Sequence, residues 1–370
     1  MARILIVSHY ARSLINFRGE MIKWMAGLGH EVFAAAPEAG FSKKLEAIGA
    51  TYLQYPLQRT GLNPLQDLRS LLALIRMMKK IKPDIVLSYA IKPVIYGSLA
   101  ARLAGIKNIF SMITGLGFVF ISGGVKQKAL QSIVGLMYKT AFKGNRAVFF
   151  QNPDDEKLIK DLGIIKNKTK TVLINGSGVD VDKYYFALPC KQPLSFLLIA
   201  RLIWDKGIGE FVEAARLIKN KYQGVTFSLL GPYDSNPAAI KPDDVSAWVK
   251  KGIVEYLGST DDVRPYIADA SVYVLPSYRE GTPRSVLEAM SMGRPIITTD
   301  APGCRETVEN GVNGFLVSVK STHVLAEVME KFIRNPDMIE QMGVESRRIA
   351  KEKYDVHKVN KVILSTMGLE

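Results

Sequence analysis

The most constraining feature of this chain is a repeated alternation of short apolar runs with longer amphipathic segments. In the first half, runs typical of buried strands recur at 3–7, 31–35, 84–88, 109–113, 147–151 and 171–174. After a pause, strands are expected at 195–199, 226–230, 254–257, 272–275 and 295–298. Short apolar strands separated by helices are typical of parallel sheets covered by helices. The sequence therefore predicts an α/β chain with two doubly wound domains facing across a cleft.

The alternation of apolar and amphipathic segments is interrupted at 189–193, and this interruption sets the expected division of the chain into domains. We place a first domain at 1–187 and a second at 188–355, and we expect a final helix, 356–370, to cross back to the first domain. A chain of 370 residues is long enough for two separate cores. Its two cysteines, Cys190 and Cys304, are far apart in sequence, which favours a reducing, cytoplasmic compartment over a disulfide framework.

Residues 275–288 carry the strongest indication of chemistry. A buried strand runs into a loop there, and a helix is expected to begin at Pro283, with Thr282 as its N-cap and the flexible Gly281 before it. The N–H groups of the first helical turn and the positive end of the helix dipole favour an anion at that point. The pattern predicts an anion site at a strand end.

Two carboxylates flank this expected site, Glu280 before the helix and Glu288 a turn and a half inside it. Carboxylates suit hydroxyl groups on either side of a phosphate, as a nucleotide-sugar presents them. Glu288 would then hold ribose hydroxyls and Glu280 the transferred sugar. Taken alone, such a pair is also typical of a helix cap and a solvated side chain.

Arg201 and Lys206 flank the loop between another strand end and helix start, so both are expected to reach the same site. A forked guanidinium and a compact ammonium are good complements to a diphosphate, although solvated basic residues are common in such a chain. Asp180 and Asp182 form a D-x-D pattern, but no third ligand accompanies them, and we interpret them as turn chemistry. We therefore expect no bound metal.

In the first domain, several polar residues are expected at carboxyl ends of strands, where ligands of such folds bind. They are His9, Arg12, Arg18, Lys92, Thr114 and Gly115, the first three in a loop expected over residues 8–18, before a helix that ends near Leu28. These residues are candidates for holding the second substrate.

The net charge of +14 favours nucleic acid, an anionic membrane or phosphorylated substrates as partners. No nucleic-acid motif is present, so we expect membrane and phosphate. The segment 65–81 is interpreted as a core-facing crossover helix. By contrast, the apolar run 118–121 next to a lysine cluster is expected to touch the inner leaflet. The residues proposed for that contact are Phe118, Phe120, Lys126 and Lys128, with Lys139 and Lys143 nearby.

These motifs resemble the retaining glycosyltransferases of family four, which have the two-domain GT-B fold. The resemblance covers essentially the whole chain and rests on the E-x7-E pair, the Arg201…Lys206 pair and the turn 258–263. It implies that Glu288 binds ribose, that Arg201 and Lys206 bind the diphosphate, and that Glu280 lies against the donor sugar. The backbone near Gly258 and Val263 would hold the uracil, with Gly281, Thr282 and Pro283 completing the donor site.

Four stretches, 8–9, 16–18, 114–117 and 275–281, resemble a bacterial subgroup that adds N-acetylgalactosamine to a sugar on undecaprenyl diphosphate. Many family members have a histidine in the segment occupied here by 89–92, and this chain has none there. Lys92 and His9 are the expected substitutes on the acceptor side.

The resemblance implies transfer of a sugar from a UDP-sugar to a lipid-diphosphate-linked glycan at the cytoplasmic membrane face, with retention and without a cofactor. The acceptor hydroxyl would attack the face that the diphosphate leaves, and a phosphate oxygen would take its proton. Arg201, Lys206 and the helix start would neutralise the leaving diphosphate, so that no metal is needed. Two alternatives stay open: a UDP-sugar 2-epimerase of the same architecture, and a membrane- or polyanion-binding protein without turnover.

Overall fold

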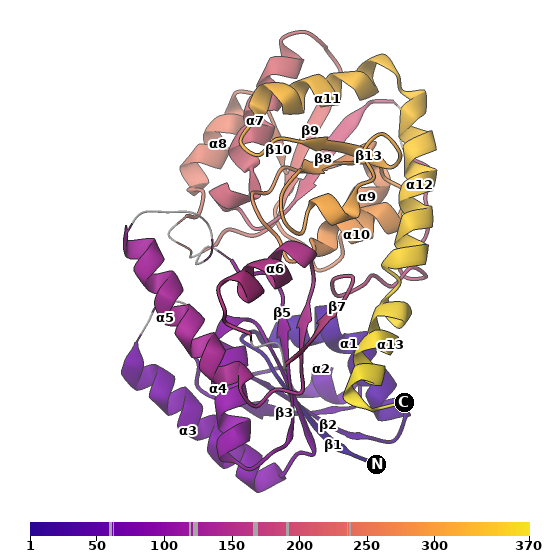
Figure 1. Cartoon of the computed structure of the whole chain (residues 1–370). Helices are drawn as coiled ribbons and strands as arrows, with labels where there is room; N and C mark the ends of the chain where they lie inside the picture. Colours follow the sequence, from indigo (N-terminus) through magenta and orange to yellow (C-terminus); the bar gives the residue numbers. More distant parts are fainter. Residues whose placement is uncertain are drawn as a thin grey trace. The chain divides into compact units, whose positions relative to one another are not determined.

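The computed structural model describes residues 1–58, 61, 63–117, 120, 125–165, 169–189, 192–234, 236 and 238–370, with only the backbone at 125 and 126. These residues form two compact units (Figure 1). The first consists of Met1–Ser177 with His357–Glu370, and the second of Gly178–Val356. Within the described ranges, no helix combines the length and the apolar character needed to cross a membrane.

The first unit is built on a parallel sheet whose described strands follow the order β3-β2-β1-β4-β5-β6-β7. The strands are β1 (Arg3–Val7), β2 (Glu31–Ala36), β3 (Ala50–Gln54), β4 (Ile85–Tyr89), β5 (Asn108–Ile113), β6 (Ala147–Phe150) and β7 (Lys170–Leu173). The order reverses between β1 and β4, so that their carboxyl ends diverge into loops on opposite sides. Ligands of doubly wound sheets bind at such a switch point.

Helices cover both faces of this sheet. One face carries α1 (Ala11–Gly27), α2 (Ser42–Glu46) and α13 (Val356–Met367), whose apolar side chains join the same core cluster. The opposite face carries α3 (Pro64–Ile81), α4 (Ile91–Leu103), α5 (Val125–Phe142) and α6 (Pro153–Asp161). The helix α3 begins after Asn63, whose side chain caps it by accepting from the Gln66 N–H, 3.3 Å away.

The second unit repeats the plan with the described strand order β10-β9-β8-β11-β12-β13. The strands are β8 (Ser195–Ile199), β9 (Thr226–Leu230), β10 (Glu255–Tyr256), β11 (Val272–Leu275), β12 (Ile296–Thr299) and β13 (Gly314–Val317). One face packs on α7 (Ile208–Lys219), α8 (Pro242–Lys250) and α11 (Thr322–Arg334). The other packs on α9 (Arg264–Asp269), α10 (Arg284–Ser291) and α12 (Asp337–Lys353). The short helices η2 (Trp204–Lys206) and η3 (Arg305–Thr307) lie in loops after β8 and β12.

The division between the units differs from the predicted boundary at 187/188. The segment that follows Gly178 belongs to the second unit, because the Val179 N–H donates to the Tyr354 carbonyl and the Val179 carbonyl accepts from Val356. Gly178 has φ +69, and a Cβ there would lie 2.6 Å from the Val356 Cα. Only glycine permits this approach.

Among the strands of the described ranges, β3 and β13 were not predicted, and both lie at edges of their sheets. Each is only partly buried; β3 contains the polar residues Thr51 and Gln54, and β13 has only three apolar residues after Gly314. The eleven predicted strands are confirmed to within two residues at either end.

Candidate active site

Three loops of the second unit follow β8, β11 and β12, which are neighbours in the sheet. Because these strands are parallel, the loops emerge at the same edge. They contain Arg201 and Lys206, then Glu280 to Pro283, and then the turn 300–304. This edge is the candidate active site.

Lys206 and Glu280 form an ion pair between the first two loops, Nζ to Oε1, and their side chains are only 18% and 14% exposed. Gly207 makes the approach possible: it has φ +71, and a Cβ there would lie 2.1 Å from the Pro276 carbonyl oxygen. The Tyr278 N–H also donates to the Asp205 carbonyl, 2.9 Å away. The two loops therefore form a single packed platform.

The third loop, 300–304, contacts the backbone of Glu280. The Glu280 N–H donates to the Pro302 carbonyl at 2.9 Å, and a Cβ on Gly303 would lie 2.2 Å from the Glu280 carbonyl oxygen. Cys304, at the end of this turn, is buried, and burial raises the pKa of its thiol to about 12. Sequence reasoning missed this supporting loop, although a Pro-Gly pair three residues beyond the strand was a visible signal.

Glu288 is held inside the unit rather than solvated. The Arg284 Nε donates to its Oε1 at 3.0 Å across one turn of α10, and the Tyr184 hydroxyl bonds to the same carboxylate. Burial raises the pKa of the Glu288 carboxyl, and the Arg284 charge opposes that rise. The carboxylate is therefore oriented by two side chains.

Tyr184 is brought to Glu288 by a second arginine. The Arg347 guanidinium donates to the Tyr184 carbonyl at 2.9 Å and to the Ser291 carbonyl at 2.7 Å. The Ser291 Oγ also donates to the Tyr184 carbonyl, 2.7 Å away. Sequence reasoning missed Tyr184, since no local pattern connects a turn near 184 with a helix a hundred residues later.

The helix α10 begins one residue later than predicted. The carbonyl of Pro283 accepts from Val286 and Leu287, so Pro283 is the N-cap and Thr282 lies outside the helix. Proline suits this place because its extended φ and ψ match an N-cap and its missing N–H is not required. Ser285, in the first turn, donates through Oγ to the Ile199 carbonyl at 3.2 Å, which ties the helix start to the end of β8.

Arg201 and the predicted uracil-binding turn lie at the same sheet edge. Arg201 is half-exposed and pairs with Asp234 at 2.7 Å rather than with a group of the platform. Gly258 has φ +74, and its carbonyl accepts from the Gly231 N–H at 2.7 Å. Val263 is the N-cap of α9. The predicted donor residues thus come from segments at one edge of the sheet. Arg201, however, forms its ion pair with Asp234.

In the first unit, two predicted loop residues lie in a helix. Arg12 and Arg18 belong to α1, which begins at Ala11, directly after the short turn that contains His9. Arg12 is exposed, whereas Arg18 is buried with its guanidinium 5.2 Å from the centre of the Tyr89 ring. The expectation of a long strand-end loop was therefore wrong, because the apolar residues of that segment follow a helical period.

Lys92 lies in an ion pair between two helices, whereas Thr114 and Gly115 lie at a strand end. Lys92, in the first turn of α4, is paired with Asp67 of α3 at 2.8 Å, and both side chains are nearly buried. Its ammonium therefore connects two helices. Thr114 and Gly115 follow β5 at its carboxyl end, and Gly115 has φ +106.

The predicted membrane segment is corrected at Phe120. This side chain is buried and packs 6.4 Å from the Tyr138 ring, within a core cluster that also contains Phe142. Phe118 and the side chain of Lys126 lie outside the described residues, and Lys128 is exposed on α5. An exposed apolar tetrad was expected, but Phe120 fills the space above Tyr138 instead.

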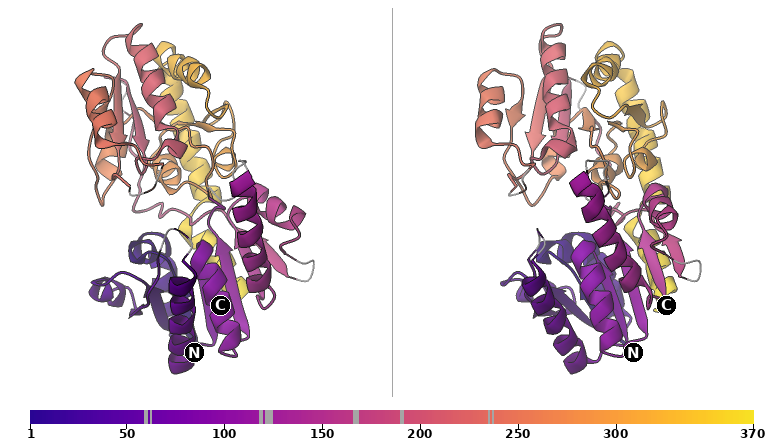
Figure 2. Two further views of the ribbon diagram at one scale, coloured as in Figure 1. Left: turned by 90° about the vertical axis from the view of Figure 1, so that its left-hand side faces the viewer. Right: turned by 60° about the vertical axis from the view of Figure 1, so that its left-hand side comes forward.

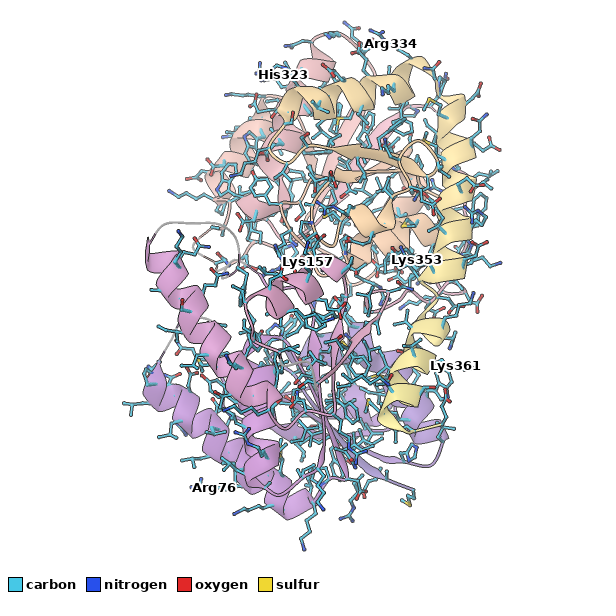
Figure 3. The ribbon with its side chains drawn as sticks, viewed as in Figure 1. Arg76, Lys157, His323, Arg334, Lys353 and Lys361 are labelled. Atoms are coloured by element: carbon cyan, nitrogen blue, oxygen red, sulfur yellow. The ribbon has the colours of Figure 1, made fainter. Side chains whose placement is uncertain are left out.

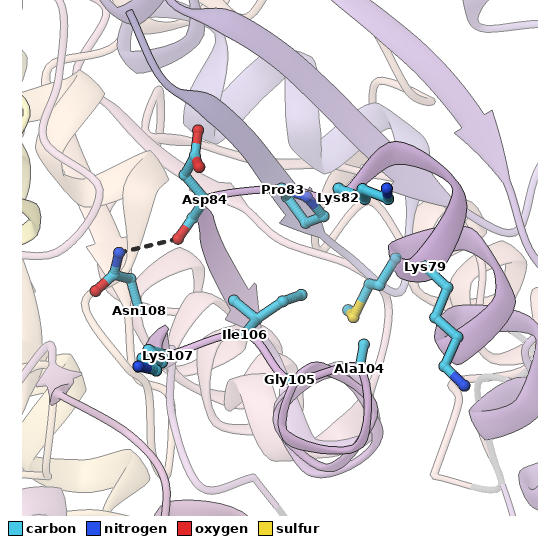
Figure 4. Close-up of a pocket in the computed structure, with 10 residues that line it drawn as sticks. Lys79, Lys82, Pro83, Asp84, Ala104, Gly105, Ile106, Lys107 and Asn108 are labelled. Atoms are coloured by element: carbon cyan, nitrogen blue, oxygen red, sulfur yellow. Dashed lines mark hydrogen bonds between the residues drawn. The ribbon is translucent and has the colours of Figure 1, made fainter.

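A cavity of about 450 Å³ lies at the opposite edge of the first sheet (Figure 4). It is lined by the end of α3, the end of α4 and the residues that precede β4 and β5, including Lys79, Lys82 and Lys107. Helix carboxyl ends carry partial negative charge, which these lysines complement. Ligands of parallel sheets bind at the carboxyl ends of strands, so this cavity does not belong to the candidate site.

The D-x-D pattern serves a turn. The Asp180 carboxylate accepts from the backbone N–H groups of Asp182 and Lys183, at 3.1 and 2.9 Å. Across the described ranges, no three His, Cys, Asp or Glu side chains gather as a metal-binding group.

Comparison with known proteins agrees with this arrangement. The family model described as "Glycosyl transferase 4-like" matches residues 13–152, and the model described as "Glycosyl transferases group 1" matches residues 193–335. The N,N'-diacetylbacillosaminyl-diphospho-undecaprenol alpha-1,3-N-acetylgalactosaminyltransferase of Campylobacter jejuni is 31% identical over 338 residues, which are 88% of each chain. The Escherichia coli UDP-Gal:alpha-D-GlcNAc-diphosphoundecaprenol alpha-1,3-galactosyltransferase is 28% identical, over 69% of this chain and 67% of its own.

Solved structures share the fold at lower identity. HepE from Anabaena in complex with UDP-glucose has a TM-score of 0.80 at 18% identity over 100% of both chains. Sucrose-phosphate synthase from Thermosynechococcus elongatus has a TM-score of 0.82 at 15% identity, over 99% of this chain and 98% of its own. The chain therefore belongs to the family-four, group 1 glycosyltransferases and has their GT-B fold.

Proposed function

We propose that this glycosyltransferase moves an N-acetylhexosamine, N-acetylgalactosamine being the best candidate, from a UDP-sugar to an undecaprenyl-diphosphate-linked glycan. It would act with retention, without a metal, at the cytoplasmic face of the membrane. The names of the Campylobacter and Escherichia relatives support a lipid-diphosphate acceptor. The UDP and UDP-glucose complexes of HepE support the donor class.

The observation that carries the proposal is the platform on which Lys206 meets Glu280, next to the start of α10. An ammonium beside a helix N-terminus suits the β-phosphate, and the adjacent carboxylate suits hydroxyls of the transferred sugar. Glu288, oriented by Arg284 and Tyr184, suits the ribose hydroxyls. The two carboxylates and the positive charge between them therefore complement the hydroxyls and the diphosphate of a nucleotide-sugar.

The proposed step breaks the bond between the anomeric carbon and the β-phosphate oxygen. The acceptor hydroxyl oxygen bonds to the anomeric carbon on the same face, and its proton passes to the departing phosphate oxygen. Lys206 and the α10 start would stabilise the charge that develops on the diphosphate. The use of the Asp180 carboxylate in a turn supports metal independence, because that group is committed to backbone donors.

The test is transfer from a panel of UDP-sugars, with and without a polyprenyl-diphosphate-linked sugar acceptor. We expect UDP release only with acceptor, and an α-linked product whose anomeric configuration, read by NMR, matches that of the donor. Inversion would refute retention. A changed sugar formed without acceptor would identify the 2-epimerase. UDP binding with no turnover on any pair would favour the non-catalytic alternative.

A further inference from the structure

The positive charge of the chain is concentrated in one part of the first unit. Between residues 64 and 146 the sequence contains thirteen Lys and Arg but two Asp and Glu, a net +11 of the total +14. One acid, Asp67, is neutralised by the nearly buried Lys92. The exposed basic residues on or next to α3, α4 and α5 are Arg69, Arg76, Lys79, Lys80, Lys82, Arg102, Lys107, Lys128, Lys139, Lys143 and Arg146.

These three helices lie side by side on one face of the sheet, with α4 between α3 and α5 (Figure 2). All three helices contribute to one core cluster, and α4 is exposed only at its carboxyl end, at Arg102 and Leu103. The exposed side chains of α3 and α5, with these two, form the surface that we call the α3–α5 face. Arg76 lies on the outer side of α3 (Figure 3).

The α3–α5 face also exposes large apolar side chains. Leu65, at 80% exposure, Leu68 and Leu72 follow one another along α3 at helical spacing, while Leu74 and Met78 of the same helix are buried. On α5, Ile133 and Leu136 are likewise exposed, Leu136 by 66%. The leucines of α3 were expected to face the core; for Leu68 and Leu72 this was wrong, because the helix is anchored by its other side.

We propose that the α3–α5 face docks on an anionic lipid bilayer. Exposed leucines among lysines and arginines match the interfacial boundary of a membrane, where apolar side chains enter the headgroup region and basic side chains meet lipid phosphates. A nucleic-acid surface would be served by the basic residues alone. The choice of a bilayer among polyanions rests on the proposed lipid-linked acceptor, whereas the surface itself stands on exposure and charge.

The first test is sedimentation of the full chain with vesicles of phosphatidylcholine, with and without phosphatidylglycerol. We expect binding to the anionic vesicles alone and release as salt rises. Each basic residue near such a surface contributes about fivefold to partitioning. Lys79→Glu with Lys80→Glu should therefore weaken binding by roughly tenfold or more. Absence of binding by the wild type would overturn the proposal.

Matched controls lie on the opposite face of the same sheet. Lys43 and Lys44 of α2 are also consecutive and exposed, so their change to Glu alters the net charge equally and should leave vesicle binding within about twofold of wild type. Leu68→Ser should weaken binding and Leu28→Ser should not, although the two leucines are 52% and 46% exposed. Equal losses in both members of a pair would overturn the assignment of the face.

The same variants separate this inference from the proposed function. With a water-soluble, short-chain diphosphate-linked acceptor, Lys79→Glu/Lys80→Glu and Leu68→Ser should retain wild-type turnover, because these residues lie outside the candidate site. Vesicle binding without any transfer would refute the function and leave the docking face standing. Transfer without vesicle binding would do the reverse. Tighter binding to duplex RNA than to anionic vesicles, unchanged in Leu68→Ser, would identify a nucleic-acid surface instead.

Discussion

The Arg284 Nε and the Glu288 Oε1 lie 3.0 Å apart across one turn of α10, with side chains only 17% and 12% exposed. This pair fixes the direction of a carboxylate that burial would otherwise favour in its protonated form. Tyr184 adds a second hydrogen bond from a segment that joins the unit through Arg347. An oriented carboxylate at this place can discriminate ribose hydroxyls.

Replacing Glu288 by Ala should weaken UDP binding by about 10- to 100-fold, the effect of losing one or two hydrogen bonds to a charged group. Calorimetric titration with UDP and with 2′-deoxy-UDP measures it. The wild type should prefer UDP, and Glu288→Ala should lose that preference. An unchanged preference would remove Glu288 from the ribose site.

Replacing Glu280 by Ala should leave UDP affinity within about twofold of wild type while lowering transfer by at least about a hundredfold, because this carboxylate serves the sugar. Lys206, freed from its acid partner, stays available to the diphosphate. UDP titration and initial rates measure the two effects, with Glu280→Gln as a matched variant of similar shape. Normal turnover in both variants would contradict the donor-site assignment.

The affinity for UDP should rise with pH as Glu288 ionises. Its pKa is raised above 4.5 by burial, so the folded protein binds that proton more tightly than the unfolded chain does. Consequently, the contribution of Glu288 to the free energy of unfolding falls as pH rises from 4.5 through the raised value. Arg284→Met removes the opposing cation and should move the rise in UDP affinity to higher pH.

The control for this pH profile is Glu288→Gln, which cannot ionise. The diphosphate titrates in all three proteins, so only the difference from Glu288→Gln reports on the carboxyl group. Identical pH profiles for wild type and Arg284→Met would show that Arg284 does not act through Glu288.

Replacing Gly207 by Ala should lower stability by about 2 kcal/mol more than replacing Gly224 does. Both glycines have positive φ, +71 and +78, but the added Cβ would contact Pro276 only at 207 and meets open space at 224. Thermal unfolding of the two variants isolates the close approach of the loops. Gly207→Ala should also lose transfer activity. Equal stability of Gly207→Ala and Gly224→Ala would indicate that the two loops can separate freely.

Transfer should survive EDTA within about twofold, because Lys206 and the start of α10 would stabilise the leaving diphosphate. Initial rates with and without chelator measure this. Complete loss in EDTA, with recovery on added magnesium, would instead implicate Asp180 and Asp182 in metal binding.

The sequence by itself determined eleven of the strands, and it determined the segments that carry Lys206, Glu280 and Glu288. Those features are local: a buried strand needs an apolar run, and a helix start needs a capping residue. The sequence also predicted Glu288 as a ligand, because its spacing from Glu280 is set within one loop and helix.

The tertiary structure decided which distant residues meet. Lys206 pairs with Glu280 because β8 and β11 are neighbours in the sheet and because Gly207 allows the close approach of Pro276. The order of strands in a sheet cannot be predicted from a local sequence pattern. Tyr184 reaches Glu288 from a distant segment, whose carbonyl is held by Arg347 and Ser291. Burial likewise depends on packing from several elements, which is why Phe120 became core while Leu68 remained exposed.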